Sequence, residues 1–325
     1  MELIDGFGRR HTDLRVSLTD RCSLRCTYCM PAEGLPWIAG SDLLTTPELM
    51  RLVGLLVEHG IRKVRLTGGE PLLRPDVVEI VAGLVRLGVD VSVTTNGLRL
   101  PHLAQPLADA GLQRVNVSLD TLRRDRFKEI TRRDRVSDVF AGLAAARIAG
   151  LHPVKVNAVL MRGINDDEAL DLLTWALSEG YHLRFIEQMP LDPQHGWDRR
   201  QMVTADEILE ELSATYHLTP AEDRGSAPAE EWLVDGGPFT VGIVGSVTRP
   251  FCAGCDRLRL TADGQLRNCL FARDEQDLRG PMRAGAHDEA LSELITANVA
   301  AKRKGHGIDE PDFVQPDRPM SAIGG

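Results

Sequence analysis

The sequence has little aromatic content, no net positive charge and no long apolar run. Aromatic side chains make up 5% of its 325 residues, and nowhere do 18 uncharged apolar residues follow one another, as a membrane-spanning helix would require. The formal net charge of −9 means that no overall positive field would attract a nucleic acid. The first 16 residues lack the apolar core of a signal peptide. We therefore expect a cytoplasmic protein that binds neither membranes nor nucleic acids and holds any anionic ligand with local cations.

Cysteine is also scarce, and its six residues fall into two groups of three. The first triplet is Cys22, Cys26 and Cys29, and the second triplet is Cys252, Cys255 and Cys269. An even number of cysteines would allow three disulfides, but a reducing compartment and the tight grouping favour metal ligation or catalysis.

Strand-like and helix-like segments alternate over the first two thirds of the chain. Runs rich in β-branched residues cover 13–19, 62–68, 90–96, 114–120, 153–160 and 182–189. Helical spacing of apolar residues covers 45–58, 76–87, 137–149, 165–179 and 204–213. Such alternation predicts parallel strands joined by helices, and six units are too few for a standard eight-stranded barrel. The predicted fold is an α/β protein with an incomplete (βα)6 TIM-like barrel.

Alternate positions within the predicted strands are polar. This polar set is Arg15, Ser17, Thr19, Lys63, Arg65, Thr67, Ser92, Thr94, Asn96, Asn116, Ser118, Asp120, Lys155, Asn157, His182, Arg184 and Gln188. Helices outside a barrel must cover its apolar positions, which leaves the polar positions facing inward. We therefore expect a polar, locally cationic chamber, whereas the alternative is an open sheet with one solvated face.

The first triplet has the spacing CxxxCxxC, with Tyr28 before its last cysteine. Three thiolates suit a [4Fe–4S] cluster with one iron left open, and a zinc site completed by His11 is the alternative. The motif resembles that of the radical S-adenosylmethionine superfamily. This resemblance implies that the open iron chelates S-adenosylmethionine, whose reductive cleavage yields a hydrogen-abstracting 5′-deoxyadenosyl radical.

A glycine pair in the sequence TGGEP, at 67–71, closes the second predicted strand and is similar to the superfamily's cofactor-binding loop. Glycine lets a backbone approach a ligand without a side-chain clash. The resemblance implies that Gly68, Gly69 and Glu70 contact the cofactor, together with Tyr28, Ser118 and Met189.

The second triplet reads CxxC, thirteen further residues and a third cysteine, with RxR after the CxxC. A cluster with one open iron is expected, and a zinc site completed by His287 or His306 is the alternative. A polar stretch near residue 220 indicates a boundary between a barrel domain over 1–219 and a C-terminal α+β extension over 220–325 that carries this second iron–sulfur cluster.

The whole pattern resembles the GTP 3′,8-cyclase family of molybdenum cofactor synthesis, through DLRVSLTDRC, TGGEP, TTNG, NVSLD, RFIEQMPLD and the terminal MSAIGG. The resemblance implies a lyase that converts GTP to (8S)-3′,8-cyclo-7,8-dihydroguanosine 5′-triphosphate, with two [4Fe–4S] clusters and S-adenosylmethionine as cofactors. It implies GTP contacts from Arg15, Lys63, Arg65, Thr94, Lys155, Arg184, Arg257 and Arg259. Arg257, Gly324 and Gly325 are the catalytic candidates, because the family's terminal glycines insert toward the active site.

Two other functions are compatible with parts of the pattern. A peptide-modifying radical enzyme would also carry auxiliary cysteines, although usually more than three in its C-terminal part. A zinc-stabilised nucleotide-binding module would have the same thiols and cations without iron or sulfide. For the cyclase, the expected partners are GTP, a one-electron donor and the next enzyme of the pathway, and a homodimer is possible.

Overall fold

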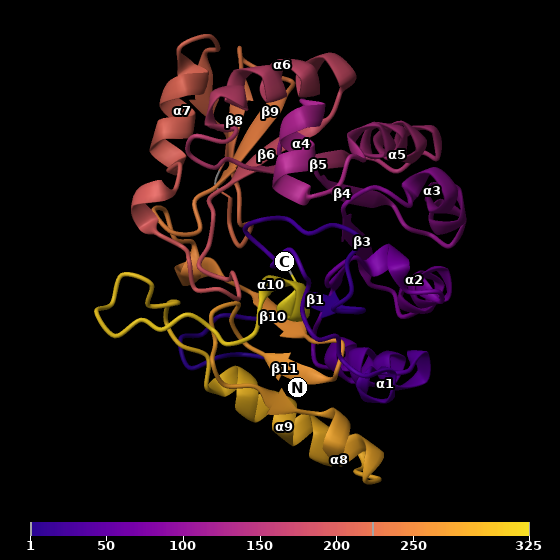
Figure 1. Ribbon diagram of the computed structural model, residues 1–325. Coiled ribbons are helices and arrows are strands. Elements are labelled where there is room, and N and C mark those ends of the chain that lie inside the picture. Colours follow the sequence, from indigo (N-terminus) through magenta and orange to yellow (C-terminus); the bar gives the residue numbers. More distant parts are fainter. Residues whose placement is uncertain (1, 223, 325) are drawn as a thin grey trace.

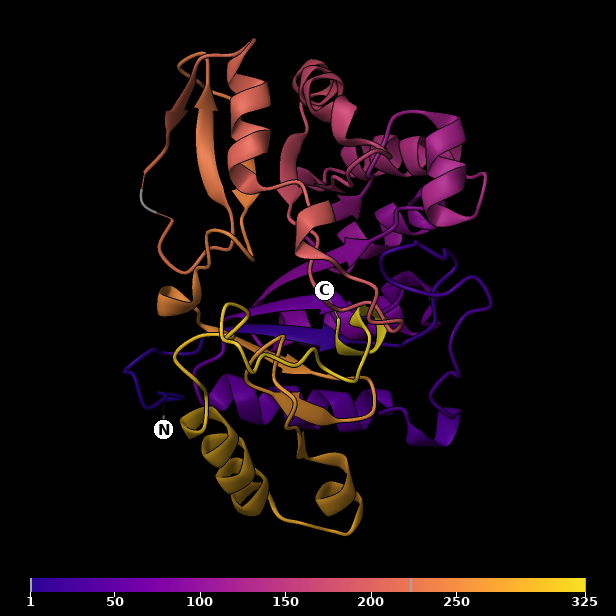
Figure 2. The same ribbon diagram turned by 60° about the vertical axis from the view of Figure 1, so that its left-hand side comes forward.

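The computed structural model of the protein describes residues 2–222 and 224–324 (Figure 1). Twelve strands form one sheet in the order β12-β11-β10-β1-β2-β3-β4-β5-β6-β9-β8-β7. The eight strands from β10 to β9 are all mutually parallel, and an antiparallel segment extends each end of this array. The parallel strands therefore form an arc with two ends rather than a closed barrel, as the turned view also shows (Figure 2).

The strands are short, as expected for a barrel wall. They are β1 Asp13–Ser17, β2 Lys63–Thr67, β3 Asp90–Thr95, β4 Arg114–Ser118, β5 Val154–Val159, β6 His182–Ile186, β7 Leu218–Pro220, β8 Glu230–Val234, β9 Thr240–Val244, β10 Arg257–Leu260, β11 Gln265–Arg267 and β12 Gln276–Asp277. The first six coincide with the six predicted strands, so that part of the prediction is confirmed.

Helices cover the outer face of the sheet, where α1, α2, α3 and α5 follow one another beside β1 to β5 (Figure 1). The α-helices are α1 Thr46–Glu58, α2 Val77–Arg86, α3 Leu100–Asp109, α4 Arg124–Thr131, α5 Val136–Ile148, α6 Ala169–Glu179, α7 Ala205–Ser213, α8 Arg279–Arg283, α9 Asp288–Ala300 and α10 Met320–Ile323. Short 3-10 turns are η1 Gly40–Asp42, η2 Pro71–Leu73, η3 Asp166–Glu168, η4 Arg199–Gln201 and η5 Cys252–Gly254. None of the helices in the described part of the chain combines the length and apolarity of a membrane span.

The sequence predictions do not include α3 and α4, nor α8, α9 and α10 in the C-terminal extension. Helix α3 starts with Pro101 in its first turn and contains Pro106, and an internal proline removes a backbone hydrogen bond. Helix α4 has eight residues, most of them polar or charged, so it lacks a long apolar stripe. By contrast, α1 and α7 each begin with a capping box, at Thr45 and Thr204, which is visible in sequence.

The second half of the chain completes both ends of the arc. Strand β10 pairs with β1, and strand β9 pairs with β6, both in parallel. The predicted incomplete (βα)6 barrel with a C-terminal extension is confirmed as the fold, and the extension adds one parallel strand to each of its edges. The sheet runs continuously across residue 220, since β7 spans it. The division into two domains at that point stays a prediction.

Glu187 connects the end of β6 to the elements that follow it. Its side chain is 1% exposed, and its carboxylate accepts hydrogen bonds from the backbone N–H groups of Ala205, Val247 and Thr248 at 2.8–2.9 Å. One buried carboxylate thus fixes the start of α7 and the loop after β9 relative to the barrel.

We predict opposite effects from glycine-to-alanine changes in two helices. A Cβ at Gly142 in α5 would lie 2.2 Å from the carbonyl oxygen of Gly97, so Gly142→Ala should lower the free energy of unfolding by about 1–3 kcal/mol. Gly54 in α1 has no atom within 4 Å of that position, and Gly54→Ala should raise the free energy by up to about 1 kcal/mol. Anaerobic denaturant titrations of both variants test this pair. If the two variants had equal unfolding midpoints, close packing of α5 against the start of α3 would not be what requires glycine at position 142.

Candidate functional site

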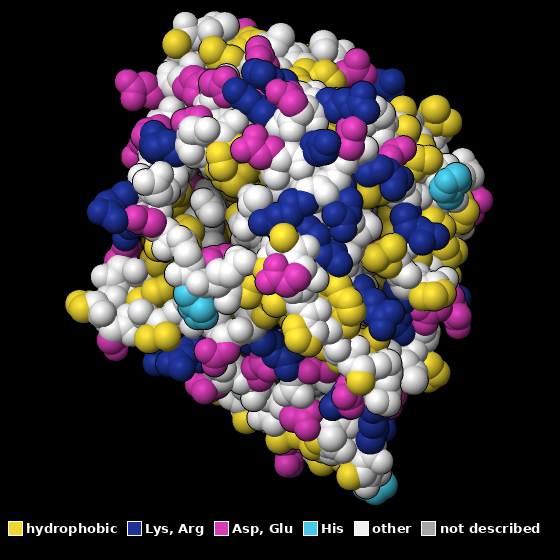
Figure 3. Space-filling view, in the orientation of Figure 1, with side chains coloured by type: hydrophobic (Ala, Val, Ile, Leu, Met, Phe, Trp, Pro, Cys, Tyr) yellow, Lys and Arg dark blue, Asp and Glu magenta, His cyan; other side chains and the backbone are white. Residues whose placement is uncertain are grey.

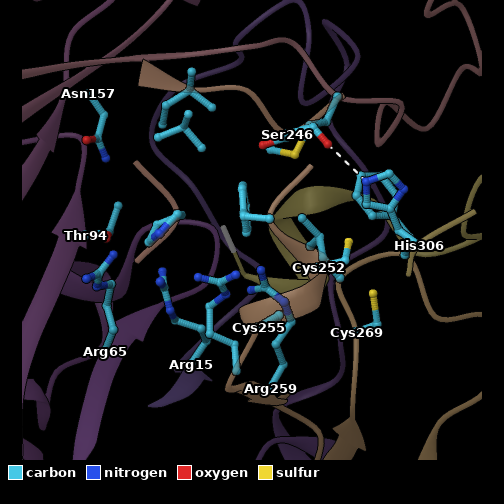
Figure 4. A pocket seen from close by; sticks show the side chains of 18 of the residues that line it. Arg15, Arg65, Thr94, Asn157, Ser246, Cys252, Cys255, Arg259, Cys269 and His306 are labelled. Atoms are coloured by element: carbon cyan, nitrogen blue, oxygen red, sulfur yellow. Dashed lines mark hydrogen bonds between the residues drawn. The ribbon is translucent and has the colours of Figure 1, made fainter. Parts of the chain in front are cut away.

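A chamber lies on the inner face of the arc, and both strand side chains and C-terminal loops line it (Figure 4). Its lining residues are Arg15, Arg65, Thr94, Asn157, Arg184, Ile186, Met189, Pro228, Val244, Ser246, Phe251, Cys252, Cys255, Arg257, Arg259, Cys269, Leu270, Phe271 and His306. Six of these residues lie on β1 to β6, and all of them except Ile186 belong to the predicted polar positions. The expected inward orientation of the polar positions is therefore observed at this wall.

Three arginines stand in one row across neighbouring strands. Arg15 on β1 is aligned with Arg65 on β2 on one side and with Arg259 on β10 on the other. Aligned residues of parallel strands point to the same face, and Figure 4 shows all three side chains along one wall of the chamber. Arg15 and Arg259 are 6% and 7% exposed, so these charges lie largely out of bulk water.

Among the described residues, few carboxylates lie close to the arginines of the chamber. The Arg15 Nε atom lies 3.3 Å from Asp13 Oδ1, and the Arg184 Nε atom lies 3.7 Å from Glu231 Oε1. The buried Nε of Arg184 and the buried Nη2 of Arg257 make no hydrogen bond within the described structure. Unpaired buried donors of this kind are suited to an anionic ligand.

The pKa values of the basic groups in and near the chamber are lowered, because burial and neighbouring positive charges outweigh the few negative charges close to them. Burial lowers the pKa of Arg65, and the neighbouring charge of Arg15 lowers it further. Burial likewise lowers the pKa of Lys155 to about 8, with Arg184 adding to the effect. Burial and repulsion both disfavour the charged forms, so a multiply charged anion in the chamber would relieve this cost.

The other residues predicted to contact GTP differ in whether they line the chamber and in how deeply they are buried. Thr94 lines the chamber, and Arg257 is 8% exposed at the start of β10. Lys155 is half-buried and aligned with Asn116 on β4. Lys63 shares the orientation of Arg65 two residues earlier on β2, but its side chain is exposed. On the face shown in Figure 3, Lys and Arg side chains gather near the middle and are interspersed with Asp and Glu elsewhere.

The first triplet lies in the loop after β1 and is anchored by the end of α4. Backbone N–H groups of Arg25 and Thr27 donate to the carbonyls of Thr131 and Ile130 at 3.0 and 2.9 Å. The Arg132 guanidinium donates to the carbonyls of Arg25 and Met30, on either side of Cys26 and Cys29. The unpredicted helix α4 thus supports the cysteine loop.

The glycine pair after β2 packs directly against this loop. A Cβ at Gly68 would lie 2.3 Å from the Thr19 carbonyl oxygen, and one at Gly69 would lie 2.4 Å from that of Arg21. The Gly69 N–H donates to the Thr19 carbonyl at 2.8 Å. Protein backbone alone therefore requires glycine at both positions, in addition to any requirement from a bound cofactor.

The remaining predicted cofactor contacts lie around the same loop. The Glu70 carboxylate accepts from Thr95 Oγ1 and from the Asn96 and Leu72 N–H groups at 2.7–3.0 Å, so protein donors already occupy it. The Tyr28 hydroxyl donates to Asp120 at 2.8 Å, and burial raises the pKa of Asp120 to about 6. Ser118 ends β4, and Met189 lines the chamber.

The second triplet gathers at one end of strand β10. Cys252 begins η5 and Cys255 follows it, both just before β10, and the antiparallel hairpin of β10 and β11 returns Cys269 to the same end. All three line the chamber. Burial alone would raise the pKa of the Cys255 thiol, but the charges of Arg257 and Lys302 outweigh it and lower that pKa.

The second triplet lines the chamber, and the two triplets lie beyond opposite ends of neighbouring parallel strands. The first triplet follows the C-terminal end of β1, whereas the second lies at the N-terminal end of β10, which runs parallel to β1. A five-residue strand at 3.3 Å per residue spans roughly 15 Å. The row of arginines lies between the two groups of thiols.

The thiols fit iron–sulfur clusters by their donor chemistry. All six cysteines are free and partly buried, and each triplet is mutually close enough for its charges to interact. No three His, Cys, Asp or Glu side chains among the described residues converge on a single metal ion. A [4Fe–4S] cluster uses a different iron for each thiolate, so its ligands are spaced more widely than those of one ion.

The tail reaches the interior of the barrel through α10, which lies beside β1 (Figure 2). The Arg259 guanidinium donates to the Gly324 carbonyl, and the backbone of Ser321 donates to the Cys29 thiol. A Cβ at Gly324 would lie 2.4 Å from Ser17 Oγ and 2.6 Å from Thr67 Oγ1. Gly325, the second predicted tail residue, lies outside the described residues.

Several chamber residues were missed as functional candidates. Phe251 stacks on the Arg257 guanidinium, whose carbon lies 4.6 Å from the ring centre. The His306 Nε2–H donates to the Ser246 carbonyl at 3.1 Å, and His306 lines the chamber, whereas the sequence indicated it only as a zinc ligand. Asn157 lines the chamber from β5 and was visible only as an inward polar position. The position of Phe251 next to Cys252 was the one available sequence signal for it.

Structural comparison supports the barrel fold. A crystal structure of Streptococcus suis SuiB matches with a TM-score of 0.61 and 13% identity, over 89% of this chain and 73% of SuiB. SuiB bound to S-adenosylmethionine matches with a TM-score of 0.59 and 13% identity, over 84% of this chain and 64% of SuiB. Native anSMEcpe with bound AdoMet matches with a TM-score of 0.60 and 14% identity, over 93% and 83% of the two chains. At these identities the likeness concerns the fold alone.

Sequence comparison is far closer. A Radical SAM superfamily model matches residues 16–176, and a Molybdenum Cofactor Synthesis C model matches residues 181–308. GTP 3′,8-cyclase from Streptomyces coelicolor is 62% identical over 99% of this chain and 96% of its own length. That from Mycolicibacterium smegmatis is 55% identical over 99% and 92%. These matches confirm the resemblance drawn from the cysteine motifs, and the chain belongs to the GTP 3′,8-cyclase family of radical S-adenosylmethionine enzymes.

Proposed function

We propose that this chain catalyses the conversion of GTP to (8S)-3′,8-cyclo-7,8-dihydroguanosine 5′-triphosphate, the first step of molybdenum cofactor synthesis. The observation that carries the proposal is one chamber lined by a row of arginines and by three cysteine thiols, with a further triplet beyond the opposite end of the same strands. Membership of the cyclase family supplies the identity of the substrate.

Each triplet would hold one [4Fe–4S] cluster. The first, with the backbone of the glycine pair and with Tyr28, Ser118 and Met189 nearby, would also hold S-adenosylmethionine. When bound, these groups supply the radical that abstracts hydrogen from ribose C3′. The open iron of the second cluster would receive the guanine ring.

The chain's own residues position the substrate between these groups. GTP carries roughly four negative charges on its triphosphate, and guanidinium groups bind phosphate oxygens in pairs. Arg15, Arg65 and Arg184 would hold the triphosphate against the barrel wall, with Lys155 and Lys63 toward the N-terminal ends of their strands. Orientation of C3′ toward one end and of guanine toward the other is the protein's main contribution to the rate.

The residues near the tail would complete the site. Arg257 and Arg259 lie beside the second triplet, where they would contact the nucleotide and bear on the late steps of the reaction. Gly324, close to Ser17 and Thr67, would help to exclude water. We also propose a one-electron donor, transfer of the product to the next enzyme of the pathway and a cytoplasmic location. A homodimer stays a prediction.

The first prediction separates the triplets by function. Changing Cys252, Cys255 or Cys269 to Ser should abolish cyclised product while leaving some cleavage to 5′-deoxyadenosine, because the first cluster remains. Changing Cys22, Cys26 or Cys29 to Ser should abolish both products. One anaerobic assay of reconstituted protein with GTP, S-adenosylmethionine and a reductant quantifies both.

Iron analysis provides the control for that assay. Wild-type protein should contain about eight irons per chain, and each set of variants should lose about half of them. A variant of the second triplet that cyclised GTP at the wild-type rate would contradict its proposed role with guanine. Stoichiometric zinc without labile sulfide in anaerobic wild-type protein would overturn the proposed function.

A second prediction concerns the buried arginines. Arg15→Ala, Arg65→Ala or Arg184→Ala should weaken GTP binding by about 1–3 kcal/mol, the magnitude of a lost charge-assisted hydrogen bond. Arg124→Ala is the matched control, because Arg124 is exposed on α4 and pairs with Asp134. Its loss should leave GTP affinity unchanged. Equilibrium binding under anaerobic conditions measures all four constants, and normal affinity in the three chamber variants would refute the cationic wall.

A third prediction concerns pH. The pKa of Lys155 near 8 means that the ligand-free protein loses this charge as the pH rises through 8, whereas bound triphosphate favours the charged form. GTP affinity should therefore fall between pH 7 and pH 9, by at most about tenfold per pH unit above 8. Lys155→Arg should keep the affinity and flatten this dependence. A wild-type affinity independent of pH over that range would contradict a role for the Lys155 charge.

A further inference from the structure

Lys302, just after α9, lies beside the second triplet and is almost completely buried. Lys302 is 5% exposed. The Nζ atom donates to the Arg257 carbonyl at 2.8 Å and lies 3.6 Å from the Cys255 sulfur. An ammonium group is normally solvated, so burial against a thiol and a single carbonyl demands a compensating negative charge.

The surrounding segment is held in place from the N-terminal part of the chain. The Arg9 guanidinium donates to the Cys252 carbonyl at 2.7 Å and to the carbonyls of Arg303 and Lys304 at 2.6 and 3.0 Å. Asp5 fixes Arg9 through a 2.6 Å ion pair. The loop that carries Cys252 and the segment that carries Lys302 are therefore tied together, so the position of the ammonium group is set before any ligand binds.

The first triplet has a different set of donors. The Cys22 sulfur accepts from the Leu24 N–H at 3.5 Å and from Asn96 Nδ2 at 3.8 Å, and the Cys29 sulfur accepts from the Ser321 backbone. These donors are neutral, whereas Lys302 places a full positive charge against a sulfur of the second triplet. A positive charge beside a cluster stabilises its reduced, more negative state and so raises its reduction potential.

We propose that Lys302 is a positioning residue of the second cluster, whose buried ammonium group secures Cys255 and raises the midpoint potential of the cluster bound there. This inference rests on the proposed function in one respect, the assignment of Cys252, Cys255 and Cys269 as cluster ligands. Its consequence is that the charge of Lys302 contributes to a difference in potential between the two clusters. Lys302 is not among the residues that line the chamber, so we assign it no direct contact with GTP.

The test is a potentiometric titration of the full-length, reconstituted protein, followed by electron paramagnetic resonance. Lys302→Met removes the charge and the donor, Lys302→Gln keeps a donor without charge, and Lys302→Arg keeps the charge. The reduction step that is missing from the Cys252→Ser variant identifies the second cluster. That step should move to lower potential in the Met and Gln variants and stay near the wild-type value in the Arg variant, while the other step is unchanged.

Lys304→Met is the matched control, since Lys304 is exposed two residues further on and undergoes the same change of charge. It should leave both potentials unchanged. Loss of the second cluster from the Met and Gln variants, with its retention in the Arg variant, would also support the proposal. The positive charge at position 302 would then be what keeps the cysteine ligands of that cluster in place. Full iron content with an unchanged second potential in the Gln variant would overturn it, as would loss of the cluster in all three variants. Absence of the second cluster from wild-type protein would instead refute the proposed function.

Discussion

The parallel register that places Arg65, Arg15 and Arg259 in one row is the constraint on which the site depends. Two like charges about 4 Å apart near a protein surface repel each other by about 4 kcal/mol. Arg15 and Arg259 are largely buried, so water screens the repulsion between such neighbouring charges less effectively. The opposite face of the same strands opposes this cost. Leu14 and Val64 are at most 1% exposed beneath the helices, and a one-residue slip would exchange the apolar and cationic faces. The helix-side core therefore holds the cations in position, and an anionic substrate reduces their repulsion.

The C-terminal part of the chain determines where the chemistry occurs along that row. Strand β10 joins the edge beside β1, and its N-terminal end carries the second triplet, whereas the C-terminal end of β1 leads into the first. Because the strands are parallel, the two cysteine groups cannot lie at the same end. A substrate bound on the arginine row, as we propose, would therefore have one triplet toward each of its ends. The tail enters the same space, since the Gly324 carbonyl accepts from Arg259.

The second triplet depends on segments far apart in the sequence. From the N-terminal part of the chain, Arg9 contacts the Cys252 carbonyl and is itself held by Asp5. From the C-terminal part, Lys302 contacts Cys255. Glu187 anchors the loop that precedes the triplet to the barrel. Such a site forms only when the whole chain is folded. The first triplet is more local, although it too needs the end of α4 to fix its loop.

Strand periodicity and ligand spacing are local properties of a chain, so the six strands, the inward polar positions, both cysteine triplets and the family could be predicted from the amino-acid sequence. It did not reveal α3, which contains Pro106, or the role of Lys302, which looks like any solvated lysine. The folded chain was needed to show that β9 and β10 complete opposite edges of the arc and that the triplets lie beyond opposite ends of the parallel strands. Strand pairing between distant segments has no local signature, since it follows from burial of the whole sheet. For the same reason, the partner of a buried charge is known only once distant segments have packed together.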